Sequence, residues 1–226
     1  MTALHSRRGW LMWVFAIGLV CMAVTPVLAQ EGDEGSMIRP SIPIWWWIAP
    51  ISAIVALIFA YKFYNEVKRA NPGDPEMIEI AGHVREGAMA YLRRQYRVVT
   101  IVFLVLAAIL AFMAYGLNVQ NPIVWFAFLT GGFFSGLCGY LGMRTATLAS
   151  NRTAAGARDS LNKGLVVAFR AGAVMGLVVV GFALIDITGW FLVLYKLFPA
   201  IGKEYHLSTI TVIMLTFGMG ASTQAL

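Results

Sequence analysis

The chain has 226 residues, of which 59% are hydrophobic and 12% charged, and its mean hydropathy is +0.74. Soluble domains carry about 25% charged residues, so this composition excludes an ordinary soluble domain and indicates an integral membrane protein. The 17 Lys and Arg residues give a net charge of +6, yet they gather in a few clusters between apolar runs instead of covering one polar face. We therefore exclude a nucleic-acid partner.

The N-terminal segment has the layout of a secretory signal peptide. Arg7 and Arg8 precede an apolar run that ends in Val-Leu-Ala at Ala29, which predicts a signal peptide at 1–29 that is cleaved after Ala29. The alternative is an uncleaved anchor helix, and either interpretation places residue 30 onward outside the cytoplasm. Residues 30–42 are then an external polar segment.

Five apolar segments follow, and each is long enough to cross a bilayer as a helix. Three consecutive tryptophans at the first entrance favour an interfacial anchor, and the second segment continues an amphipathic stretch that projects into the cytoplasm. The predicted class is an all-α, polytopic membrane helix bundle in the cell (inner) membrane, in contact with lipids. The predicted spans are 43–63, 98–117, 122–144, 164–197 and 207–226. The second of them belongs to a longer helix that begins at residue 76.

The distribution of basic residues predicts the orientation of these helices. Seven Lys and Arg residues lie between residues 62 and 97 and five between 144 and 170, whereas the external segments hold three. Cytoplasmic loops of membrane proteins carry the excess of Lys and Arg, so we expect the loop 151–163 to face the cytoplasm. The fifth segment stops without a polar tail, and we expect 43–226 to be the truncated N-terminal part of a longer helix bundle.

Small residues four positions apart predict the helix contacts, because they let neighbouring backbones approach closely. The two cysteines, Cys21 and Cys138, lie inside apolar runs and are interpreted as packing residues, not as redox groups. The predicted contact pairs are Gly132 with Gly136, Ser135 with Gly139, Gly172 with Gly176, and Gly218 with Ser222.

The chain contains no recognisable catalytic, cofactor-binding or metal-binding constellation, because its three histidines are far apart and no phosphate-binding loop occurs. Two ionisable residues lie within apolar runs, where a charge is a functional candidate. Arg170 can reach the cytoplasmic interface or pair with a neighbouring helix. Asp186 is about 24 Å further along the helix and cannot pair with it. Ion transport, a local hydrogen bond and a water-filled vestibule all remain open for Asp186.

Four segments resemble the N-terminal part of the membrane-integral inorganic pyrophosphatases, which are ion pumps driven by pyrophosphate hydrolysis. They are REGAMAYLRRQY at 85–96, GMRTATLASNRTAAGAR at 142–158, GLVVAFRAGAVMG at 164–176 and GMGASTQAL at 218–226. The resemblance extends from about residue 48 to residue 226, in the family's order and spacing.

The resemblance implies a homodimeric pump that takes pyrophosphate as substrate, binds it through Mg²⁺, and moves H⁺ or Na⁺, with K⁺ as a further candidate cofactor. The aspartates that hold Mg²⁺ in the family lie beyond residue 226, so the resemblance assigns no catalytic or metal-binding residue to this chain. Ser222 matches a serine near the family's ion gate, which implies an ion-ligand role. The competing interpretation of Ser222 is a small residue at a helix contact.

Two rival functions come from other classes. The first is a membrane scaffold or assembly subunit without catalytic activity. The second is a small secondary transporter, which would require a pair of helices interrupted by Gly or Pro around a substrate, and no such pair occurs.

Overall fold

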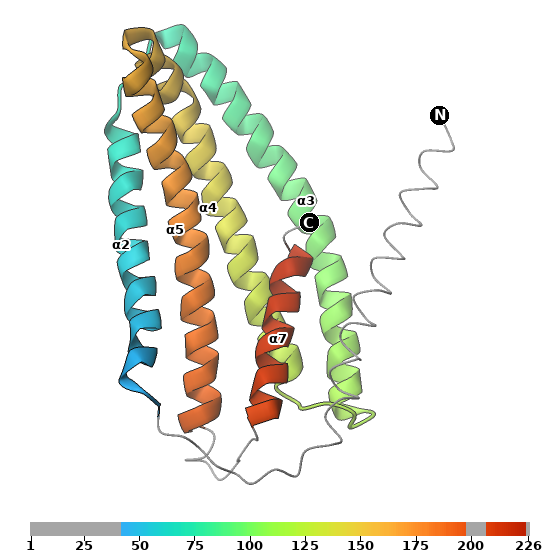
Figure 1. The fold of residues 1–226 in the computed structure, drawn as a ribbon. Helices are drawn as coiled ribbons and strands as arrows, with labels where there is room; N and C mark the ends of the chain where they lie inside the picture. Colours follow the sequence, from blue (N-terminus) through green and yellow to red (C-terminus); the bar gives the residue numbers. More distant parts are fainter. Residues whose placement is uncertain (1–41, 198–206, 225–226) are drawn as a thin grey trace, which may run out of the picture.

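The protein folds into long helices, and a computed structural model describes residues 42–197 and 207–224 (Figure 1). The expected signal peptide, residues 30–41 and the expected external segment 199–206 lie outside the described residues. All elements within these ranges are helical, which confirms the all-α class. They are the 3₁₀ helix η2 (Ile44–Trp47), α2 (Ile48–Arg69), α3 (Pro75–Tyr115), α4 (Val124–Asp159), α5 (Leu161–Leu192), the π-helix η3 (Val193–Leu197) and α7 (Leu207–Gln224).

Among the described residues, four helical stretches are long and apolar enough to cross a membrane. This confirms a multi-pass membrane protein and the first four predicted spans. The fifth predicted span is also helical, but α7 has 18 residues and is not one of these four stretches. The four stretches are Ile44–Arg69, Pro75–Tyr115, Val124–Asp159 and Leu161–Lys196.

Proline and glycine separate α2 from α3 at the predicted break. Gly73 has a φ of +88°, a conformation open mainly to glycine, and Pro75 opens α3 at a position where its missing N–H costs nothing. The uninterrupted α3 then confirms that the amphipathic stretch and the second span form a single helix.

The predicted loop 151–163 is wrong. Residues 151–159 complete α4 and α5 begins at Leu161, so Ser160 alone connects the two helices. The alanines and arginines of this stretch are good helix formers, and the Ser160 hydroxyl accepts a hydrogen bond of 3.3 Å from the Lys163 amide and thereby caps α5. α4 itself begins at Val124, two residues after the predicted start.

α4 is the central helix, because α3, α5 and α7 all pack against it, while α2 lies on the outer side of α5 (Figure 1). On the α3 side, the rings of Phe103 and Phe128 stack with centroids 4.6 Å apart. On the α5 side, Cys138 is buried beside Val174 and Val178, which confirms its packing role.

The glycine pairs on α4 lie at helix contacts as predicted, whereas those on α5 and α7 do not. A Cβ added at Gly132 would meet the Phe103 ring, and one at Gly139 would meet the Tyr96 hydroxyl. Gly172, Gly176 and Gly218 have no heavy atom of a neighbouring side chain or helix within 4 Å of an added Cβ.

The contact between α4 and α7 depends instead on Gly131 and Gly220. A Cβ at Gly131 would meet the Phe217 carbonyl of α7, and one at Gly220 would meet the Phe128 carbonyl of α4. The two backbones therefore touch directly, and four-residue spacing alone did not identify which face of α7 makes this contact.

The two ends of the bundle differ in composition. The α2–α3 connection and the Ser160 turn lie together at one end, at the top of Figure 1; we call it the basic end because Lys68, Arg69, Arg158 and Lys163 lie there. The opposite end, called the tryptophan end, holds Trp46, Trp47, Trp125 and Trp190. At this end Trp46 packs against Phe191, with ring centroids 5.4 Å apart.

We expect the basic end to face the cytoplasm, as the charge distribution predicts. A cysteine at Ser160, with Cys21 and Cys138 replaced by alanine, should therefore resist an impermeant thiol reagent added to intact cells. The matched control is Val119→Cys in the exposed turn at the tryptophan end, which should react. The reverse labelling pattern would invert the orientation.

Candidate functional site

The first polar cluster joins the α2–α3 connection to the end of α4. The side-chain amide of Asn151 donates a hydrogen bond of 2.8 Å to the Pro72 carbonyl, and Asn151 is 9% exposed. The guanidinium of Arg158 pairs with Asp74, the residue before α3. These contacts fix the start of α3 against α4. Asn151 and Arg158 lie in the segment 142–158, which resembles the family. The sequence alone did not predict that they contact Pro72 and Asp74.

Arg170 forms an ion pair with a neighbouring helix, which was one of its two predicted roles. Its Nε lies 3.1 Å from Oε2 of Glu66 in α2, and both side chains are partly exposed. The pair links α5 to α2 and brings two opposite charges together. Arg170 and Asp186 form no ion pair with each other in the described residues, as the length of the helix predicted.

Asp186 lies on the face of α5 that packs against α4 and is 8% exposed. The Thr130 hydroxyl of α4 is within hydrogen-bonding reach of its carboxyl group. One helical turn along, the Trp190 indole donates a hydrogen bond of 2.8 Å to the same hydroxyl. The Thr130 hydroxyl itself donates a hydrogen bond of 2.9 Å to the Ala127 carbonyl of its own helix, so a local hydrogen bond stays one of the three predictions for Asp186. The residues Thr130 and Trp190 were not singled out by the sequence, because the register of α4 against α5 was not known.

Ser222 is exposed on α7, whereas its neighbour Thr223 is buried. The Thr223 hydroxyl donates to the Met219 carbonyl of its own helix. Nearby, a cavity of about 400 Å³ lies between α3, α4, α5 and α7, and Tyr96 and Gln224 are among the polar residues that line it. Ser222 is not part of that lining, so its predicted role as an ion-gate ligand stays a prediction.

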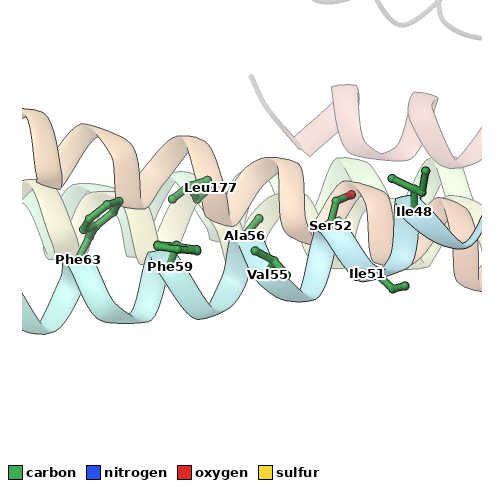
Figure 2. A pocket seen from close by; sticks show the side chains of 8 residues that line it. All are labelled: Ile48, Ile51, Ser52, Val55, Ala56, Phe59, Phe63 and Leu177. Carbon is green, nitrogen blue, oxygen red and sulfur yellow. The ribbon is translucent and has the colours of Figure 1, made fainter.

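A second cavity, of about 650 Å³, is an open groove along α2 from Ile48 to Phe63, with Leu177 of α5 beside it (Figure 2). Its walls are apolar except for Ser52, whose hydroxyl donates to the Ala49 carbonyl of its own helix. Figure 2 shows Leu177 of α5 beside the α2 side chains Ala56 and Phe59. A groove without free polar groups suits hydrocarbon and offers no contacts to a phosphate.

Within residues 42–197 and 207–224, no group of three His, Cys, Asp or Glu side chains lies close enough together to hold a metal ion. The carboxylates that the structure brings into contact are bound by single cations, as in the pairs of Asp74 with Arg158 and Glu66 with Arg170. In this part of the chain these two pairs form contacts between helices.

The chain is similar in sequence to a known protein family and to several of its members. Residues 54–226 match the family model described as inorganic H⁺ pyrophosphatase. A Bacteroides thetaiotaomicron protein named putative K⁺-stimulated pyrophosphate-energized sodium pump is 56% identical over 185 residues, which is 81% of this chain and 25% of that protein. A Moorella thermoacetica protein named K⁺-insensitive pyrophosphate-energized proton pump 2 is 41% identical over 179 residues, or 79% of this chain and 24% of that protein.

A third relative, from Methanosarcina mazei, is named K⁺-insensitive pyrophosphate-energized proton pump and is 32% identical over 178 residues, or 78% of this chain and 26% of that protein. The chain thus spans about a quarter of the length of the curated relatives that it matches. The names differ in the ion pumped and in the response to K⁺, while all three specify pyrophosphate as the energy source.

Proposed function

Because the chain belongs to the membrane-integral inorganic pyrophosphatases, we propose that the whole protein hydrolyses pyrophosphate and uses the released free energy to move H⁺ or Na⁺ across the membrane. The match to the family model over residues 54–226 carries this proposal. The multi-pass helix bundle supports it, since coupled transport requires a membrane-embedded frame.

We propose that this chain contributes the frame and that the chemistry lies elsewhere in the protein. Mg²⁺ would be needed to neutralise the charge of pyrophosphate, yet the described residues of this chain do not fit such a site. Its contribution is mechanical: α4 supports α7 through the backbone contact at Gly131 and Gly220. The connection at Asn151 and Pro72 holds α3 in place at the same time.

We propose Na⁺ as the transported ion and K⁺ as a stimulating ion. The relative named a K⁺-stimulated sodium pump is 56% identical to this chain, against 41% and 32% for the two relatives named proton pumps. We also propose that the protein acts as a homodimer, as expected from the resemblance. The exposed Ser222 remains a candidate ion-gate ligand in this scheme.

The function is tested with the full-length protein in inverted membrane vesicles. We expect phosphate release from pyrophosphate that requires Mg²⁺, increases with K⁺, and is accompanied by Na⁺ uptake into the vesicles. Vesicles from cells with the empty vector are the control. Absence of phosphate release at every Na⁺ and K⁺ concentration would reject the pyrophosphatase function, and acidification of the vesicle lumen without Na⁺ uptake would identify H⁺ as the transported ion.

A further inference from the structure

The carboxyl group of Asp186 is enclosed between α4 and α5, and no described residue provides it with a cationic partner. The residue is 8% exposed, and its Oδ2 is buried with no hydrogen-bond partner. The ion pairs among the described residues use other carboxylates, namely Asp74, Asp159 and Glu66. An ionised carboxylate without a partner is costly to bury, and more so at membrane depth.

Aromatic side chains close the contact between α4 and α5 on both sides of Asp186. Toward the tryptophan end, the rings of Phe126 and Trp190 meet edge to face at 5.9 Å. Toward the basic end, Phe134 and Phe182 meet at 5.5 Å. Residues at intervals of four on α4 thus face residues at intervals of four on α5, and Asp186 lies at the level between two aromatic pairs.

The Thr130 hydroxyl, which is the donor found beside Asp186 in the described part of the chain, also has other partners. The Thr130 hydroxyl is within reach of the carboxyl group but also lies 2.9 Å from the Ala127 carbonyl of its own helix. A hydroxyl has one proton to donate, and the indole of Trp190 already donates to its oxygen. Two or three hydrogen bonds can strongly stabilise the ionised form of a carboxyl group, whereas Oδ2 of Asp186 has no hydrogen-bond partner, so these surroundings favour the neutral acid.

Among the described residues, the other ionisable groups that could compensate the charge lie too far away. Lys196 of η3 follows Asp186 by ten residues, about 15 Å along the helix, and its ammonium lies over the Trp47 ring. Arg170 is about 24 Å away and is paired with Glu66. On α4, Cys138 lies two turns from Thr130 toward the basic end. Residues 207–224 of α7 contain no ionisable side chain, and those of α2 begin at Tyr61 in its second half.

We propose that Asp186 is a proton-binding site, at which the carboxyl group keeps its proton in the folded protein and thereby remains neutral between α4 and α5. The bound proton removes the charge that the aromatic surroundings cannot solvate. Release of the proton requires α4 and α5 to separate at this level, so proton binding and closure of the contact between these helices stabilise each other. The inference rests on the geometry of this chain and stands independently of the pyrophosphatase function.

The test compares full-length wild type with Asp186→Asn in detergent and follows thermal unfolding between about pH 5 and about pH 8, the range where most folded proteins are stable. Asparagine resembles the neutral acid but cannot release a proton. If the folded state keeps a proton that the unfolded state loses, the stability of wild type relative to Asp186→Asn falls as the pH rises, by up to about tenfold in the unfolding equilibrium constant per pH unit. Glu66→Gln, which alters a paired carboxylate, is the control and should not remove this pH dependence.

Identical pH profiles for wild type and Asp186→Asn would overturn the proposal, as would a wild type whose relative stability increases with pH. If Asp186→Asn does not fold, the wild type is treated with a hydrophobic carbodiimide, which modifies protonated carboxyl groups, and the modified residue is located by mass spectrometry. Modification of Asp186 that decreases as the pH rises supports a bound proton. The proposal is overturned if Na⁺ at constant pH protects Asp186 from modification by the carbodiimide, or if Asp186 is not modified at any pH.

Discussion

Replacing Gly220 by alanine is expected to destabilise the full-length protein by about 3 kcal/mol, the upper end of the range for overpacked sites. The added Cβ would meet the Phe128 carbonyl of α4, and a backbone atom within a helix cannot move aside as a side chain can. The whole of α7 would have to shift away from α4, which would also disturb the contact of Gly131 with Phe217. The measurement is the midpoint of thermal unfolding in detergent, together with the yield of folded protein.

Gly218→Ala is the matched control, because it lies two residues away on the same helix and has no neighbouring side chain or helix within 4 Å of an added Cβ. Alanine is favoured over glycine in a helix by about 1 kcal/mol, so this variant should be neutral or more stable. The two substitutions are chemically identical and are expected to have opposite signs. Equal unfolding midpoints for the two variants would show that α4 and α7 do not touch at Gly220.

Asn151→Ala is expected to cost about 1 kcal/mol, the net contribution of a typical intramolecular hydrogen bond, because the half-exposed Pro72 carbonyl can bind water instead. The substitution deprives the Pro72 carbonyl of the amide that now donates to it at 2.8 Å. The connection between α2 and α3 would then be held mainly by the exposed pair of Asp74 with Arg158, and exposed ion pairs contribute little. We expect faster proteolytic cleavage within residues 70–74, measured by limited digestion, in addition to a lower unfolding midpoint.

The control for this variant is Ser150→Ala, the preceding residue, which is exposed and whose hydroxyl donates only to the Thr147 carbonyl of its own helix. Its stability and its rate of cleavage should match the wild type. If both alanine variants are cleaved at the wild-type rate, the contact of Asn151 with Pro72 does not hold the connection.

The sequence was sufficient to predict the class of the fold and, within the described residues, the order of the four long membrane-spanning helices. Apolar runs of membrane-spanning length leave a backbone few alternatives to a helix, and the proline and glycine residues between α2 and α3 ended the helices where expected. The loop 151–163 was mispredicted because its charged and polar residues indicated departure from the membrane. Leaving the membrane does not require the helix to end, and α4 continues into the polar region.

Helix contacts were predictable only in part, because small residues identify a face that can be approached and do not identify the approaching partner. Gly132 and Gly139 on α4 met this expectation, whereas Gly172 and Gly176 on α5 have no close neighbour in the described residues. The face that α7 turns toward α4 is the one on which Gly220 meets the Phe128 backbone, and the spacing of small residues along one helix does not identify such a pairing.

At the candidate site, too, the sequence identified individual residues but not their partners. Arg170 and Asp186 were recognisable as ionisable residues within apolar runs, and this signal depends on composition alone. Their partners, Glu66 for Arg170 and Thr130 for Asp186, come from other helices. Those partners could be named only after the antiparallel register of α4 and α5 and the packing of α2 on α5 were known.

The one-residue connection at Ser160 restricts how α4 and α5 can move relative to each other. Two helices joined by a long loop can slide past each other by a full turn, but Ser160 provides no slack for such a displacement of α5 along α4. The close approach of Gly164 to the Ala157 backbone beside this connection opposes sliding further. A displacement of α4 along its axis must therefore carry α5 with it, whereas the two helices can still separate from each other at the tryptophan end, away from Ser160.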